Sequence, residues 1–423
     1  MGAKQMIRET PVIQRNEYCR LCSSSSLELV IALEPTPLAN SLVTAEQLDV
    51  AEDRYPLDVF ICRNCSHIQL LDVVDPEILF RDYAYVSGTS QLYVDYLKQY
   101  ANDVIEVYGL KEGDLVVEIG SNDGTLLRHF VNRGLKVLGV DPARNLAEMA
   151  EQSGIPTIAK FFTPDLAKEL KETHGSAKLL IANHVFAHAD NLKSVVDGVR
   201  ELLTSDGIFA FEVSYWLDVY KKALFDTIYH EHLSYHTVGP LTGFFARNGM
   251  ELIDTQRVNH QGGSLRCMVQ LEGGPWPQNL SVQRLIREED EHLSTGVNTR
   301  FKDLSELIEL GRRQLTELLA SIQAEGGRVA GYGAPAKTTT LMYQFGLDAG
   351  QLEFIADDSP LKQGLFTPGL HIPIVSPEEI YNRRPDYLLV LAWNFADSIM
   401  DRHRAFAEAG GKFIVPLPTL RIC

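Results

Sequence analysis

Short apolar runs alternate with helical stretches in two separate regions of the chain. The first region, between residues 115 and 213, contains the runs LVVEIG, KVLGVD, KLLIAN and GIFAFEV. The second, between residues 328 and 417, contains RVAGYG, LEFIADD, YLLVLAW and KFIVPL. Such alternation indicates parallel strands joined by crossover helices. The pattern therefore predicts an α/β chain with two Rossmann-like units.

The segments around these units complete the predicted organisation. GMELIDTQRV and SLRCMVQL, separated by NHQGG, are typical of an antiparallel strand pair. A parallel sheet that ends in such a pair is the layout of a class I methyltransferase fold, although other folds could produce it. We expect a small N-terminal module over 1–80, a methyltransferase domain over 81–278, and connector helices with a C-terminal α/β domain over 279–423.

Composition and charge narrow the class of protein. The chain is 45% hydrophobic and 22% charged, as in a soluble globular enzyme. A formal net charge of −17 argues against nucleic-acid binding through a broad basic face. No apolar run approaches the ~20 residues that span a bilayer, and the first residues contain no secretory signal. We expect a cytoplasmic monomer without membrane or nucleic-acid partners.

Four of the six cysteines form two C-x-x-C pairs, Cys19 with Cys22 and Cys62 with Cys65. In a reducing cytosol such pairs are more often metal ligands than disulfides. Four thiolates fill a tetrahedral Zn²⁺ shell and leave no position for water, so the zinc should be structural. The alternative is four free thiols. The loop between the pairs, and the tyrosine-rich stretch behind it, are candidates to cover an active site.

A glycine-containing turn, Glu118 to Gly124, follows a predicted strand and opens a helix. Asp141 ends the next strand, 21 residues after Gly120, where a carboxylate can accept both ribose hydroxyls. Glu118 favours S-adenosylmethionine over a dinucleotide, because a carboxylate suits a sulfonium and repels a pyrophosphate. Asn183 ends a further strand, and it could equally cap a helix. The predicted cofactor-binding residues are Glu118, Gly120, Asn122, Asp123, Gly124, Asp141, Pro142 and Asn183.

Polar side chains also gather in residues 229–236, beyond another predicted strand. Strand carboxyl ends are where such sheets keep their chemistry. On a helix, Tyr229 and His232 would share one face, and His232 and His236 another. The group also contains His230, Glu231 and Tyr235, and a second histidine pair, His184 and His188, follows the strand KLLIAN. These residues could bind a metal or transfer protons, and we favour acid–base chemistry.

A second glycine loop, GYGAPAK at residues 331–337, again lies between a strand and a helix. Backbone amides with a lysine suit phosphate groups, although the loop could be a mere turn. Asp357 and Asp358 end the following strand, where they could bind a ribose or a base. The predicted substrate-binding residues are Gly333, Ala334, Lys337, Asp357, Asp358 and Lys362.

Taken together, these motifs resemble the nucleotide-sugar C-methyltransferases of deoxysugar biosynthesis. The resemblance rests on the paired C-x-x-C motifs, EIGSNDG, the YHEH of residues 229–232, GGSLR at 262–266 and GYGAPAK. It implies methylation at C3 of a TDP- or GDP-linked 4-keto-6-deoxyhexose through an enolate. It also implies that His232 is the base, that Tyr229, Glu231 and His188 assist, and that Tyr83 or Tyr85 reaches in from the N-terminal module. Glu231 could raise the basicity of His232.

Two other classes of protein remain open at this point. The second glycine loop could bind NAD in a dehydrogenase or epimerase of a nucleotide sugar. Alternatively, the cysteines could form a zinc ribbon in an interaction protein with an inactive methyltransferase core.

Overall fold

The structure is a computed structural model that describes residues 12–259, 262–294 and 297–423. Its N-terminal module is a small antiparallel sheet with the strand order β11–β4–β3–β2. Three strands are local: β2 (Leu27–Ile31), β3 (Val59–Cys62) and β4 (Ile68–Leu70). The fourth, β11 (Ser234–Tyr235), comes from far along the chain and pairs with β4 through Ser234 and Gln69. The sequence right after the YHEH motif is thus part of the N-terminal module.

The central sheet has seven strands in the order β12–β13–β10–β9–β6–β7–β8, with β12 and β13 antiparallel to each other and β13 antiparallel to β10. β6 is buried along its whole length, as expected for a strand covered by helices on both faces. The predicted antiparallel finish, and with it the class I methyltransferase layout, is confirmed. The strands are β6 (Leu115–Ile119), β7 (Lys136–Val140), β8 (Thr157–Ile158), β9 (Ala177–Asn183), β10 (Leu203–Ser214), β12 (Met250–Val258) and β13 (Ser264–Leu271).

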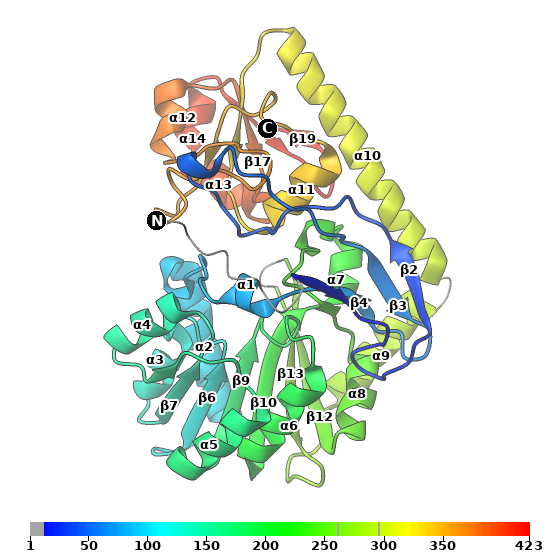
Figure 1. Cartoon of the computed structure of the whole chain (residues 1–423), viewed down its shortest axis with the longest axis vertical. Coiled ribbons are helices and arrows are strands. Elements are labelled where there is room, and N and C mark those ends of the chain that lie inside the picture. The colour runs from blue at the N-terminus through cyan, green and yellow to red at the C-terminus, as the bar shows by residue number, and fades with distance from the viewer. Residues whose placement is uncertain (1–11, 260–261, 295–296) are drawn as a thin grey trace, which may run out of the picture.

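Helices cover both faces of this sheet (Figure 1). One face is packed by α2 and α3, whose apolar side chains share a core with β6 and β9. The other is packed by α5, α6 and α8. The helices of this part are α2 (Gln91–Tyr108), α3 (Thr125–Val131), α4 (Arg144–Gln152), α5 (Pro164–His174), α6 (Leu192–Leu202), α7 (Trp216–Lys221), α8 (Val238–Arg247) and α9 (Leu280–Glu289).

The C-terminal sheet has the order β16–β15–β14–β17–β18–β19, parallel except for the last strand. The long helix α10 (Val297–Ala324) leads into it along one side of the molecule (Figure 1). Its elements are β14 (Val329–Tyr332), α11 (Lys337–Phe345), β15 (Ile355–Ala356), β16 (Ile374–Val375), α12 (Glu378–Arg383), β17 (Tyr387–Val390), α13 (Ala396–Arg402), α14 (Arg404–Glu408), β18 (Lys412–Val415) and β19 (Arg421–Ile422).

One hydrophobic core joins the N-terminal module to the C-terminal unit. It contains Ile31 and Val59 from the small sheet, Phe225 from the short helix η3 (Phe225–Thr227), and Phe345 from α11. The rings of Phe225 and Phe345 lie 5.5 Å apart. Burying such large side chains is worth roughly 1.5–3 kcal/mol each. The residues after η3, where the YHEH motif begins, are therefore held by both flanking units.

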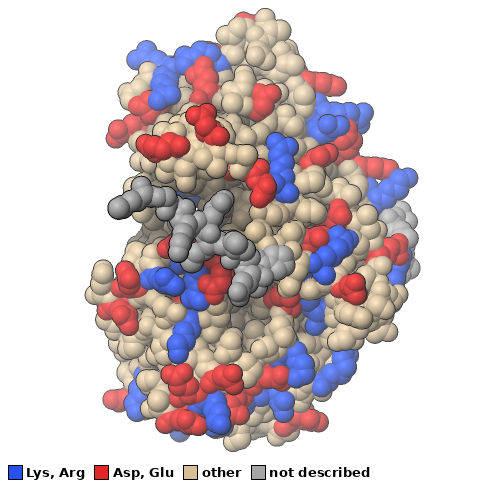
Figure 2. All heavy atoms as spheres, viewed as in Figure 1, with Lys and Arg blue, Asp and Glu red and all other residues tan. Residues whose placement is uncertain are grey.

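Short elements complete the chain, and most of them lie in residues 12–90, which we call the N-terminal arm. These are β1 (Ile13–Arg15), η1 (Ala45–Gln47), β5 (Asp72–Val74), α1 (Pro76–Phe80), η2 (Ser87–Thr89), η4 (Asp290–Ser294) and η5 (Trp393–Phe395). Over the described ranges, the helices are too short or too polar to cross a membrane. On the face seen in Figure 2, acidic and basic side chains are interspersed and form no broad basic patch.

Candidate active site

The four paired cysteines meet at one point. Their sulfur atoms all lie within 4.8 Å of one another, with 3.6 Å between Cys19 and Cys65 and 3.5 Å between Cys22 and Cys62. A tetrahedral Zn²⁺ with bonds of 2.3 Å needs sulfurs about 3.8 Å apart, so the thiols fit a closed zinc shell. The sequence prediction of a structural zinc site is consistent with this geometry.

We expect one zinc per chain, and we expect Cys62→Ser to reduce both zinc content and thermal stability. Cys62 is buried in β3, where a lost ligand also loosens the base of the small sheet. Metal analysis and thermal unfolding of the variant are the measurements. Purified protein that contains no zinc, or that keeps its full stability after chelation, would contradict a structural role.

The cofactor turn between β6 and α3 has the backbone shape that the sequence predicted. Gly120 has φ +69°, and a Cβ there would lie 2.2 Å from Cγ2 of Val185, so only glycine fits. Asp141 fixes the turn from the end of β7. Its carboxylate accepts the backbone N–H of Asn122 at 2.8 Å and that of Ala143 at 2.8 Å.

The N-terminal arm closes against the same turn. The backbone N–H of Ser87 donates to Oδ1 of Asn122 at 2.9 Å, and that of Gly88 donates to Oδ2 of Asp123 at 3.2 Å. The side-chain amide of Asn122 donates to the carbonyl of Tyr85 at 3.0 Å. The tyrosine-rich segment thus lies directly beside the cofactor turn, as we expected of a covering segment.

Two acceptors at the carboxyl end of the sheet fit the amino and sulfonium groups of S-adenosylmethionine. Glu118 is buried, and Oε2 of its side chain has no hydrogen-bond partner within the described residues. Burial, together with the charges of Asp141 and Asp123, raises its pKa well above the usual value. Oδ1 of Asn183 is also buried without a partner in the described chain. A cationic ligand here would satisfy both groups.

The sequence predicts that the carboxylate of Asp141 accepts the ribose hydroxyls. On that prediction, Asp141→Ala should weaken S-adenosylmethionine binding by about 2–3 kcal/mol, because charge-assisted hydrogen bonds would be lost. Calorimetry measures the effect. Asp357→Ala is the matched control. The carboxylate of Asp357 accepts a backbone N–H of the second glycine loop as that of Asp141 does at the first, and we expect its loss to leave donor affinity unchanged. Unchanged donor affinity in Asp141→Ala would refute the assignment.

The polar group at 229–236 is not helical, and the shared faces predicted for it are wrong. The chain bends and turns over residues 229–231 and then enters β11, because β4 offers it backbone hydrogen bonds that a helix could not use. Nδ1 of His232 lies 2.7 Å from the carbonyl oxygen of Thr227. A carbonyl only accepts, so Nδ1 carries the proton, and Nε2 keeps a lone pair.

Aromatic rings surround His232. The ring of Tyr229 lies 4.0 Å from it, and the ring of His188 stacks on it at 5.1 Å. Phe80 of α1 in turn stacks on His188 at 5.6 Å. His188 and His232 are both half-buried. Nε2 of His188 is itself buried and has no hydrogen-bond partner within the described residues.

The hydrogen bonds of Glu231 go to residues other than His232, so the contacts give no support to the expectation that Glu231 raises the basicity of His232. The two carboxylate oxygens of Glu231 accept hydrogen bonds from the hydroxyl of Tyr83 at 2.6 Å and from the side-chain amide of Asn40 at 2.6 Å. Burial raises the pKa of Glu231 to about 7. Tyr83 therefore reaches the motif from the N-terminal arm. The backbone carbonyl of Tyr85 lies at the cofactor turn, and its phenol is close enough to Tyr229 to raise the pKa of that residue. Asn40, within the loop between the cysteine pairs, was missed, since nothing in EPTPLANS marks a ligand.

Three other histidines of the region have structural partners. Nε2 of His230 lies 3.2 Å from the carbonyl of Tyr55, and His236 is buried between the rings of His67 and Phe186. His184 pairs with Glu212 in the central sheet. Of the predicted group, the structure brings Tyr229, His232 and His188 together.

We expect the imidazole of His232 to stay neutral down to about pH 5. Burial lowers its pKa to about 4, against the raising effect of the Thr227 carbonyl, so folding favours the neutral form and protonation is delayed to lower pH. Carbon-13 NMR of labelled histidine, assigned with His232→Asn, follows the titration. A midpoint near the ordinary value of about 6.5 would contradict it.

The second glycine loop resembles the first in construction. Gly333 has φ +87°, and the backbone N–H of Ala334 donates to Oδ2 of Asp357 at 2.7 Å. Lys362 donates to the carbonyl of Ala334 at 2.8 Å. Asp358 turns away from this group and accepts from the hydroxyl of Tyr332 at 3.0 Å.

Lys337 lies at the start of α11 and reaches across to the YHEH region. Its ammonium is 3.3 Å from the buried carboxylate of Asp226, which also accepts the indole N–H of Trp393 at 2.6 Å. Thr340, one turn further along α11, has a hydroxyl that donates to the carbonyl of Ile228 at 2.7 Å. Asp226 was missed because its partner is more than a hundred residues away. The loop predicted to bind phosphate is therefore adjacent to the turn that carries His232.

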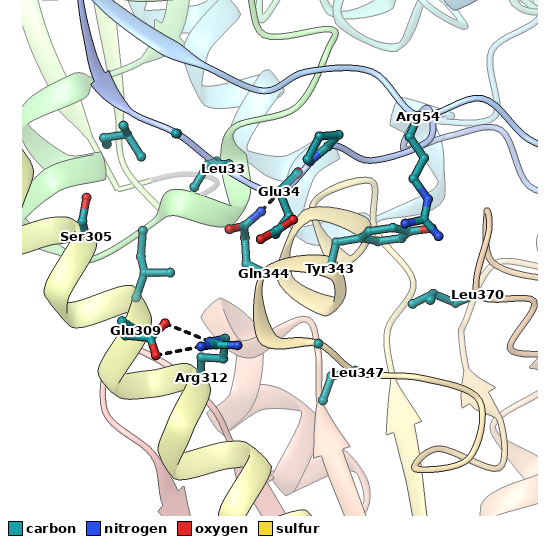
Figure 3. A pocket seen from close by; sticks show the side chains of 15 residues that line it. Leu33, Glu34, Arg54, Ser305, Glu309, Arg312, Tyr343, Gln344, Leu347 and Leu370 are labelled. Carbon is teal, nitrogen blue, oxygen red and sulfur yellow. Dashed lines mark hydrogen bonds and ion pairs between the residues drawn. The ribbon is translucent and has the colours of Figure 1, made fainter.

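A cavity of about 600 Å³ lies apart from the residues around His232 and the two glycine turns, between α10, α11 and the N-terminal module (Figure 3). Arg54, Arg312, Tyr343 and Gln344 line it. Tyr343 and Gln344 belong to the end of α11 that is distant from Lys337. This cavity contains none of the residues predicted for the cofactor, the substrate or catalysis.

Three known protein families match three successive segments of the chain. Residues 19–80 match a family described as a zinc binding domain, residues 93–255 a methyltransferase domain, and residues 259–418 a C-methyltransferase C-terminal domain. The C-methyltransferase NovU of Streptomyces niveus is 37% identical over 411 residues, which are 97% of this chain and 98% of NovU.

Solved structures give weaker similarity. The PH0226 protein of Pyrococcus horikoshii OT3 covers 47% of this chain and 98% of its own length, with a TM-score of 0.36 and 13% identity. Magnesium protoporphyrin IX methyltransferase of Synechocystis PCC 6803, with bound SAM, covers 45% of this chain and 88% of its own, with a TM-score of 0.34 and 14% identity. At these scores the fold assignment rests on strand order and not on the neighbours.

Proposed function

Since this chain belongs to the family of S-adenosylmethionine-dependent C-methyltransferases, we propose that it methylates C3 of an NDP-4-keto-6-deoxyhexose, the nucleotide being TDP or GDP. The observation that carries the proposal is the orientation of His232. Its Nδ1 donates to the Thr227 carbonyl, which leaves Nε2 as a proton acceptor beside the ring of Tyr229. A carbon nucleophile next to a ketone needs such an acceptor, because the carbon has no lone pair before its proton leaves.

In the proposed reaction, Nε2 of His232 takes the proton from C3. The electron pair of that C–H bond forms a double bond between C3 and C4, and the π pair of the ketone moves onto the C4 oxygen. The hydroxyl of Tyr229 donates to this oxygen as its negative charge develops. Burial and the nearby Glu231 raise the pKa of Tyr229 well above its usual value, so the hydroxyl stays protonated and able to donate. S-adenosylmethionine, when bound, would supply an electrophilic methyl group. As the C4 ketone re-forms, the enolate electron pair at C3 would bond to the methyl carbon, and the methyl–sulfur bond would break with its electron pair left on sulfur, so that S-adenosylhomocysteine leaves. His232 would then release its proton to water.

The remaining predicted residues would hold the two ligands. Glu118, Asn122, Asp141 and Asn183, at the carboxyl ends of the central strands, would bind the donor. The loop from Gly333 to Lys337 would bind the diphosphate. A diphosphate near His232 is negatively charged and would raise the pKa of the imidazole, which strengthens it as a base.

The proposed organisation keeps the boundaries 1–80, 81–278 and 279–423, and we propose a cytoplasmic location, where the cysteines stay reduced. The reaction needs no nicotinamide, and Glu118 would repel a pyrophosphate at the first glycine turn. The NAD-dependent alternative is therefore not retained, nor is the interaction protein.

The experiment that tests this function is mass spectrometry of TDP- and GDP-linked 4-keto-6-deoxyhexoses incubated with enzyme and S-adenosylmethionine. We expect one of them to gain the mass of one methylene group, with the new methyl on C3 by NMR. Methylation on oxygen, or at another carbon, would refute the assignment of C3.

A further inference from the structure

Arg20 lies inside the first cysteine turn, between Cys19 and Cys22, yet its side chain is only 1% exposed. Its Nε donates to Oδ1 of Asp190 at 2.9 Å, and its Nη1 donates to Oε1 of Gln69 at 3.2 Å. Nη1 also contacts the carbonyl oxygens of Leu70 and Leu233, the latter at 3.4 Å. One buried guanidinium thus joins the zinc turn to three other segments of the chain.

The second cysteine turn has an arginine at the same position, and it behaves differently. Arg63, next to Cys62, has a side chain that is 40% exposed and pairs with Glu28 on the surface of the small sheet. Surface pairs of this kind contribute about 0–1 kcal/mol. A buried guanidinium, in contrast, is costly unless its partners are well placed. The burial of Arg20 is therefore not a requirement of the C-x-x-C turn itself.

The segments that Arg20 joins are those that carry the two stacked histidines. Leu233 directly follows His232, and Asp190 comes two residues after His188. The same two segments also meet each other, because the backbone N–H of Ser234 donates to the carbonyl of Ala187 at 3.1 Å. Asp190 is held in place by a second donor from the N-terminal arm, the side-chain amide of Asn16, at 2.6 Å.

We propose that Arg20 is a positioning residue that sets the distance and stacking of His188 and His232, with the zinc-binding turn as its anchor. The position of His232, the proposed base, would then depend on the N-terminal module. The structural zinc would anchor Arg20 but would take no part in the chemistry. Displacement of a reacting group by about 1 Å can cost 10²-fold in rate. A small shift of the segment that carries His188, or of the one that carries His232, would therefore be enough to slow the reaction measurably. The inference about rate rests on the proposed function, whereas the inference about histidine geometry does not.

The test compares Arg20→Met with Arg63→Met, which changes the same position of the other cysteine turn. We expect Arg20→Met to keep its zinc and its affinity for S-adenosylhomocysteine. In labelled-histidine NMR, the signals of His188 and His232 should shift in Arg20→Met and remain unchanged in Arg63→Met. C3 proton exchange should fall about 10- to 100-fold in Arg20→Met only, and the KM for the sugar nucleotide should change little.

Asp190→Asn provides a second variant if Arg20→Met does not fold, because Asp190 is partly exposed and the change removes the charge that pairs with Arg20, while the contacts of Arg20 with Gln69, Leu70 and Leu233 stay. We expect the His188 signal to shift more than that of His232. Unshifted signals in a folded Arg20→Met or Asp190→Asn protein would overturn the proposal, as would equal effects of Arg20→Met and Arg63→Met. Shifted signals without any substrate turnover in wild type would instead refute the proposed function and leave the positioning role intact.

Discussion

Replacement of His232 by asparagine should lower methyl transfer by about 10²-fold or more, with donor and sugar-nucleotide affinities near those of wild type. The reason is chemical, because Nε2 of His232 is the group that accepts the C3 proton. Asparagine keeps a polar side chain near the Thr227 carbonyl but cannot take up a proton. Single-turnover rates with both ligands saturating, together with calorimetry of each ligand, measure the two effects separately.

His230→Asn is the matched control for this prediction. His230 lies two residues earlier in the same turn, but its ring contacts the carbonyl of Tyr55 and not the stacked rings. We expect this variant to lose some stability and to keep the chemical step. Equal loss of rate in both variants would mean that the turn, and not the imidazole of His232, is what the reaction requires. His188 would be the next candidate for the base if His232→Asn stays active.

Tyr229→Phe should lower kcat by about 10²–10³-fold, the range seen when one donor to a developing oxyanion is removed. Phenylalanine keeps the ring that packs 4.0 Å from His232 and removes only the hydroxyl. Because the oxygen gains its charge in the transition state, KM should change much less than kcat.

Tyr235→Phe controls for loss of a hydroxyl in the same region. The hydroxyl of Tyr235 is buried and lies 3.5 Å from the Thr227 carbonyl, so it is not available to a substrate. We expect this variant to retain kcat. An unchanged kcat in Tyr229→Phe would exclude its hydroxyl as the donor to the enolate oxygen.

The two Rossmann-like units could be predicted because their strands are short apolar runs, and burial of β6 and β14 on both faces requires such runs. The cysteine tetrad could be predicted because the chemistry of zinc fixes the ligands and their pairing. The shape of the glycine turns followed from positions such as Gly120, where a side chain would clash with Val185. These features depend on local sequence or on a strict chemical requirement.

The turn around His232 could not be predicted, because partners distant in sequence decide its conformation. β11 forms only since β4 lies alongside it, more than 160 residues earlier. Glu231 is oriented by Asn40 and Tyr83, and Asp226 by Lys337 and Trp393. Local spacing therefore suggested helical faces that do not exist, although the residues singled out as reactive do meet.

The central claim is that His232 removes the C3 proton, and proton exchange tests it most directly. The sugar nucleotide is incubated with enzyme in deuterated water, without S-adenosylmethionine, and the C3 proton is followed by NMR. The account predicts that wild-type enzyme exchanges this proton, that His230→Asn does so at a similar rate, and that His232→Asn does not. Exchange in His232→Asn at the wild-type rate would contradict the account, because another group would then be the base.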